Sequence, residues 1–246
     1  MILVIILILL LVLLYSKHSK VHECFYLMKN VEFVDKETLI QMLINDNDNF
    51  YKYFFPNDYK VRNINNISEY KNRIISSVVN LNQEEKNKVI QCCNDIVDKK
   101  YSWFDNVKFN DIKWKIGSTS GKLYENGLSH TRNDVIIISK EYINKSSIKE
   151  LTRTLLHEKV HIYQKLYPVD VDKFLDFYKF KKLKIRDGSD NTRANPDVDQ
   201  WIYVDGNNMV YKAEYISNPK SLGDTKSRNQ LYEHPFEKMA IEISSP

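Results

Sequence analysis

A segment near the middle of the chain carries the signals of one long helix. Ser147 and Glu150 have the spacing of a capping box, in which each side chain bonds a backbone amide at the start of a helix. Apolar residues then recur at helical spacing, and they are Leu151, Leu155, Leu156, Val160, Tyr163 and Leu166. Pro168 supplies a stop signal after Tyr167. The sequence therefore predicts a helix from about Ile148 to Tyr167.

The pattern His-Glu-x-x-His lies in the middle of this helix, as His157-Glu158-Lys159-Val160-His161. Residues four apart share one face of a helix, so both imidazoles can bind one zinc ion. Glu158 lies beside them, where a carboxylate can act as general base on the water that zinc activates. Two such histidines also occur as ordinary polar residues of an amphipathic helix. The Glu between them favours the metal site.

A catalytic zinc site needs a third protein ligand and keeps its fourth position for water. The metzincin continuation is excluded, because Gln164 and Tyr167 stand where that family has Gly and His. Near the C-terminus, Pro235 can begin a second helix with Glu237 in its first turn. Ala240 follows one turn later, where a small side chain permits close packing. Glu237 is the predicted third ligand, although a carboxylate at this position also complements a helix dipole.

The two segments together resemble the gluzincins, which are zinc metallopeptidases with a Glu ligand on a later helix, often in the pattern Glu-x-x-Ala. Glu237-Lys238-Met239-Ala240 fits this pattern. The combination of His157–Gln164 with His234–Glu237 is similar to compact metallopeptidases found in large DNA viruses and some microbes. The separation between the two segments is longer than in thermolysin-like enzymes, so Glu233 and His234 remain alternative third ligands.

This resemblance implies hydrolysis of peptide bonds in a peptide or protein substrate, with Zn²⁺ as cofactor. Glu158 would take a proton from the attacking water and return it to the leaving amine. The oxyanion needs a further donor, and the candidates are Tyr232, His234, Arg193 and Tyr215. Gln164 and Thr154 are spaced to face the ligand side of the helix, where either can orient a ligating histidine.

A strand is predicted just before the motif helix, over Asn133–Ser139. In zincins a strand beside the cleft aligns the substrate, and a peptide would bind by adding a strand to its edge. The continuous Val and Ile run is equally typical of any buried strand, so it says nothing about substrate. His130 precedes this strand and could approach the cleft, but it is interpreted as a surface-loop histidine.

The first residues of the chain, Met1–Tyr15, contain no charge, Gly or Pro and are almost wholly aliphatic. A helix of this length spans about 22 Å, less than the ~30 Å hydrocarbon core, but Lys17 and Lys20 can extend its reach. Leu14-Tyr15-Ser16 makes a poor signal-peptide cleavage site. Residues 1–20 are therefore predicted to be an uncleaved single-pass membrane anchor, and the positive residues after it place the bulk of the chain in the cytoplasm.

Residues 21–246 are predicted to form one α+β, zincin-like metallopeptidase domain with a small mixed sheet and an active-site helix. Three further helices are expected at Asp35–Ile44, Ser68–Val79 and Asn82–Asp98. Strands are expected at Ile112–Gly117, Val135–Ser139, Trp201–Val204 and Met209–Ile216. The last two strands are expected to form a hairpin. The basic cluster Lys179–Arg186 is interpreted as a solvated helix end. Oligomeric state is left open.

Two other classes of function remain alternatives. The first is a catalytically inactive membrane or virion protein that keeps a zincin fold as a structural or binding module. The second is a nucleic-acid-associated protease resembling the SprT-like group. The net charge of +4 is modest and spread along the chain, so no nucleic-acid partner is expected.

Overall fold

The centre of the structure is a four-stranded mixed sheet. The computed structural model describes residues 30–94, 96–226 and 232–245. The strands are β1 (Val31–Phe33), β2 (Trp114–Thr119), β3 (His130–Arg132) and β4 (Val135–Ser139), in the spatial order β1-β2-β4-β3. The first three in this order are parallel, and β3 runs antiparallel to β4. The predicted strand Val135–Ser139 is confirmed, and the strand predicted at Ile112–Gly117 lies two residues later.

Both faces of this sheet are buried. Successive side chains of a strand point to opposite faces, so the β4 residues divide between two cores. Ile136 and Ile138 join one apolar cluster, while Val135 and Ile137 join the other. The continuous Ile run of β4 is thus explained by burial on both sides.

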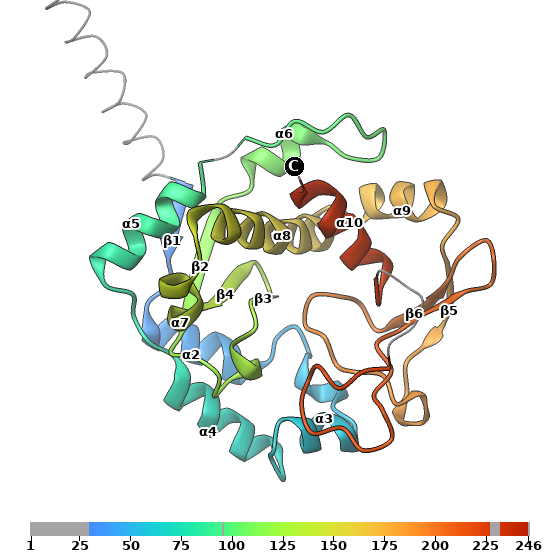
Figure 1. Cartoon of the computed structure of the whole chain (residues 1–246), viewed down its shortest axis with the longest axis horizontal. Helices are drawn as coiled ribbons and strands as arrows, with labels where there is room; N and C mark the ends of the chain where they lie inside the picture. The colour runs from blue at the N-terminus through green and yellow to red at the C-terminus, as the bar shows by residue number, and fades with distance from the viewer. Residues whose placement is uncertain (1–29, 95, 227–231, 246) are drawn as a thin grey trace, which may run out of the picture.

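Helices cover the two faces. On one side lie α2 (Lys36–Asn45) and α4 (Ile67–Ser77), and on the other lie α5 (Gln83–Cys92) and α8 (Ile148–Leu166). Figure 1 shows α8 running across the sheet, opposite α2 and α4. The approach of α2 requires a glycine in β2, because a Cβ at Gly117 would come within 2.7 Å of the Leu39 side chain.

The motif helix α8 has the predicted start. The Ser147 hydroxyl accepts a hydrogen bond from the Glu150 amide, and the Glu150 carboxylate accepts one from the Ser147 amide, so the capping box is confirmed. The helix ends at Leu166. Pro168 does more than stop it, because this proline is the first residue of another helix, α9 (Pro168–Phe177).

The helix predicted at Asn82–Asp98 is shorter than expected. It ends at Cys92, and the next helix is α6 (Asn106–Asp111). The Asn110 amide bonds both backbone groups of Val97, with Nδ2 at 2.9 Å from its carbonyl and Oδ1 at 3.1 Å from its amide. These bonds replace those that a longer helix would have made. Two further short helices are α3 (Pro56–Val61) and α7 (Lys140–Lys145).

A second, antiparallel sheet contains β5 (Lys181–Ile185), β6 (Trp201–Val204) and β7 (Val210–Tyr211) in sequence order. The predicted hairpin is confirmed, although its second strand is shorter than Met209–Ile216. The helix-end interpretation of Lys179–Arg186 is wrong, because this segment contains the exposed edge strand β5. Lysines on an edge strand discourage pairing with other chains.

The last helix, α10 (Pro235–Ser244), packs along α8. Met239 and Ala240 are fully buried, consistent with the close approach expected at Ala240. Within the ranges that the structure describes, no helix combines the length and apolarity needed to cross a bilayer. The anchor predicted for residues 1–20 lies outside the described residues.

Candidate metal centre

Helices α8 and α10 bring three potential ligand atoms together. His157 Nε2 lies 3.1 Å from His161 Nε2 and 3.2 Å from Glu237 Oε2, and His161 Nε2 lies 3.7 Å from the same carboxylate oxygen. Zinc bonds of about 2.0–2.1 Å in a tetrahedron would separate such ligand atoms by about 3.4 Å. The observed triangle therefore has the size of one face of a tetrahedral zinc site.

The three side chains differ in exposure. His161 is fully buried, whereas the side chains of His157 and Glu237 are 23% and 17% exposed. These two line a cavity of about 160 Å³. The triangle is thus closed on the protein side and open toward the cavity.

The orientation of His161 is set by Gln164, one helical turn later. Gln164 Nε2 donates to the carbonyl of Phe236 at 2.9 Å, so its Oε1 faces His161 Nδ1, also at 2.9 Å. An amide oxygen accepts, so Nδ1 carries a hydrogen and Nε2 is the ring nitrogen that faces the triangle, where it can exchange a proton for a cation. Gln164 lies where the helical spacing placed it. Thr154 does not orient a histidine, because its hydroxyl forms a hydrogen bond of 2.7 Å with the Tyr142 hydroxyl.

Glu158 lies beside the triangle, on the wall of the same cavity. It is buried, and among the described residues its Oε2 has no hydrogen-bond partner. One potential metal-ligand atom from each of Glu158, His161 and Asp197 lies within 4.8 Å of the other two. Burial raises the pKa of Glu158 well above its usual range, and the carboxylates of Asp197 and Glu237 add to this rise. A buried, unpartnered carboxylate facing a cavity is suited to receive a proton there.

The charges at the triangle favour a cation. Burial lowers the pKa of His161, but the carboxylates of Glu237 and Asp197 outweigh it and raise the pKa to about 9. Burial raises the pKa of Glu237, but the neighbouring His161 and His157 outweigh it and hold the pKa well below the usual range. In the metal-free protein a proton on His161 thus balances the Glu237 carboxylate, and a divalent cation can replace that proton.

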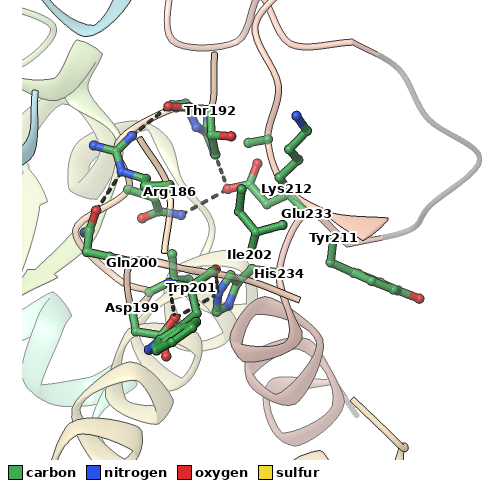
Figure 2. A pocket seen from close by; sticks show the side chains of 14 residues that line it. Arg186, Thr192, Asp199, Gln200, Trp201, Ile202, Tyr211, Lys212, Glu233 and His234 are labelled. Carbon is green, nitrogen blue, oxygen red and sulfur yellow. Dashed lines mark hydrogen bonds and ion pairs between the residues drawn. The ribbon is translucent and has the colours of Figure 1, made fainter. Parts of the chain in front are cut away.

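The alternative third ligands, Glu233 and His234, do not join the triangle. Figure 2 shows Glu233 and His234 in a separate small pocket that includes Trp201 and Asp199. His234 accepts from the Phe236 amide at 3.1 Å as the cap of α10, and its Nε2 lies 3.3 Å from Asp199 Oδ1. Glu233 accepts from Arg193 and Asn195. The triangle is completed by Glu237.

Of the four proposed oxyanion donors, Arg193 lines the cavity beside the triangle. Tyr215 instead donates to Asp58 at 3.1 Å, in a different part of the core. His234 is engaged in its own pocket, and the Tyr232 ring lies beneath the Lys238 ammonium. Arg193 is thus the one of these four candidates that lies at the cavity.

His130 is not a surface-loop residue. It begins strand β3, is only 3% exposed, and lines the cavity. Its Nδ1 lies 2.9 Å from the Leu128 carbonyl and therefore donates, while among the described residues Nε2 has no partner. Burial lowers the pKa of His130, so the ring is neutral and Nε2 is an acceptor. The interpretation as a loop residue failed because the short strand β3 has little local sequence signal.

The predicted substrate strand is also placed differently. β4 lies between β2 and β3, so it has no free edge. The edge strand next to β4 is β3, where the Thr131 amide donates to Asp197 Oδ1 at 2.5 Å and the Thr131 carbonyl accepts from Lys165 Nζ at 3.2 Å. Asp197 was not predicted as a site residue. The expectation that a peptide pairs with the edge of the strand at Asn133–Ser139 is therefore wrong.

Comparison with known proteins identifies no relative of this chain. No protein-family model, no curated protein and no solved structure matches the chain.

Proposed function

We propose that this protein is a zinc-dependent metallopeptidase with a zincin-like domain, in which His157, His161 and Glu237 hold the metal and Glu158 is the general base. The observation that carries this proposal is the ligand triangle, with separations of 3.1, 3.2 and 3.7 Å. Two imidazole nitrogens and one carboxylate oxygen are a ligand set that catalytic zinc uses. When bound, zinc would polarise the substrate carbonyl and lower the pKa of a water toward ~7.

The side chains around the cavity have separate tasks in this reaction. Glu158 Oε2 accepts a proton from the attacking water and later delivers it to the leaving nitrogen. Burial keeps this carboxylate from being solvated, which favours its protonated form during the reaction. Arg193 is the one Lys or Arg among the described residues that line the cavity, and its positive charge can stabilise the developing oxyanion.

The substrate class proposed is a peptide or protein, bound at the cavity of about 160 Å³ beside the metal ligands. A cavity near this size accepts a group as large as benzene, so it can take one substrate side chain. Membrane attachment through residues 1–20, with the bulk of the chain in the cytoplasm, stays a prediction from the sequence.

The test compares zinc content and peptide cleavage in the purified full chain and in Glu158→Gln. We expect both proteins to hold zinc, and cleavage to fall by about 10²–10⁴-fold in the variant, because it loses the proton acceptor and keeps the ligands. Glu150→Gln is a matched control on the same helix, since Gln also serves in a capping box. A parent that holds zinc and cleaves no peptide would favour the non-catalytic binding module.

A further inference from the structure

Asn195 joins two carboxylates at the edge of the metal site. Its Nδ2 donates to Glu237 Oε1 at 2.9 Å and to Glu233 Oε1 at 3.1 Å. An amide nitrogen carries two hydrogens, so one is available for each carboxylate. The second oxygen of Glu237, Oε2, is the atom that faces His157 and His161. Asn195 therefore donates its hydrogen bond to Oε1, the oxygen of Glu237 that does not face the ligand triangle.

The other end of the same amide holds the loop that carries Asp197. Asn195 Oδ1 accepts a hydrogen bond from the Asp197 amide at 2.9 Å. The Asp197 carboxylate in turn accepts from the Thr131 hydroxyl at 2.9 Å and lies close to Glu158. One side chain thus connects the ligand Glu237 with a carboxylate beside the base.

The orientation of the amide is fixed by its surroundings. Rotating it by half a turn would place Oδ1 against Glu233 and Glu237 and would place Nδ2 against the Asp197 N–H. All three contacts would then be repulsive. Arg193 reinforces the observed arrangement, because it donates to the same Glu233 oxygen at 2.5 Å and so holds that carboxylate in place.

We propose that Asn195 is a positioning residue for the metal site, which holds Oε1 of Glu237 so that Oε2 alone is presented to the metal. This role rests on the proposed function. A carboxylate that is free to rotate can bind through both oxygens, which would use the position that a catalytic site leaves open. Hydrogen bonding to the outer oxygen prevents this and fixes the direction of the inner one.

The test is the zinc dissociation constant of the full chain, measured by competition with a chromogenic chelator. Asn195→Ala removes the bonds to Glu237, and Asn195→Asp replaces the donor with a carboxylate oxygen facing two carboxylates. We expect both variants to bind zinc about 10–100-fold more weakly. Asn110→Ala is a matched control, because Asn110 also makes two hydrogen bonds, to Val97, outside the metal site. This control should lower the melting temperature and leave zinc affinity unchanged.

A second readout separates positioning from a purely structural role. The visible absorption of the cobalt(II)-loaded protein depends on coordination number, so it should change in Asn195→Ala and stay the same in Asn110→Ala. Zinc affinity and cobalt spectrum both equal to those of the parent would overturn the role of Asn195 and leave the proposed function standing. A parent that binds neither metal would overturn the proposed function, and this role with it.

Discussion

His161 is the most constrained of the three residues proposed as metal ligands. It is fully buried, and its Nδ1 lies 2.9 Å from Gln164 Oε1. Gln164 is itself held by the Phe236 carbonyl, at the start of α10. The direction of one proposed ligand on α8 therefore depends on the docking of α10, the helix that carries another proposed ligand.

Replacing Gln164 tests this dependence. Gln164→Leu removes the acceptor for His161 Nδ1, so the ring loses its fixed tautomer, and zinc should bind about 10–100-fold more weakly. Gln164→Glu keeps an acceptor oxygen and should retain more of the affinity. Chelator competition measures both. Equal affinity in parent and Gln164→Leu would show that Gln164 has no influence on the ligand.

At the residue scale, local spacing predicted part of the site. His157, Glu158, His161 and Gln164 are related by helical spacing alone, so the sequence placed them on one helix. Asp197 could not be found in this way, because its place depends on a bond to Thr131, 66 residues away along the chain. The neighbourhood of a buried carboxylate is a property of the fold, which no local pattern reports.

At the scale of elements, Asp170 joins three helices. It lies in the first turn of α9 and accepts from Tyr163 of α8 at 2.9 Å, from Lys108 of α6 at 2.8 Å and from Lys173 at 2.9 Å. Burial by itself raises the pKa of Asp170, but these hydrogen bonds outweigh it and lower the pKa to about 2. The ionised carboxylate thus stabilises the junction of these helices.

Asp170→Asn should therefore lower the free energy of unfolding by about 1–2 kcal/mol near neutral pH, since exposure of the lysines weakens the ion pairs. A lowered pKa stabilises the folded state above the unfolded pKa of about 3.9, and this contribution is lost as the pH falls toward about 2. Urea unfolding at pH 6 and pH 3 measures the difference between parent and variant. A difference that is as large at pH 3 as at pH 6 would contradict the assignment to the ionised carboxylate.

Elements with local signals were predictable, and those that depend on distant partners were not. The start of α8 followed from Ser147 and Glu150, and its end from Pro168. In contrast, β5 is so rich in Lys that its sequence resembles a solvated surface, and only pairing with β6 makes it a strand. The helix after Asn82 was predicted too long because the bonds from Asn110 to Val97 are tertiary.

At the scale of the whole molecule, the site is assembled from segments far apart in the chain. Strand β3, helix α8, the loop at Asn195 and helix α10 all contribute to one cavity. The proposed ligands are close together only in the folded state, so metal binding and folding should be coupled. Zinc is therefore expected to raise the melting temperature of the full chain.

The most direct measurement of the central claim is the zinc content of the purified full chain beside that of His157→Ala and Glu237→Ala. The ligand triangle predicts about one zinc per chain in the parent and loss of that zinc in both variants. A folded parent without zinc, or a Glu237→Ala variant that keeps it at parental affinity, would contradict the metal centre proposed for α8 and α10.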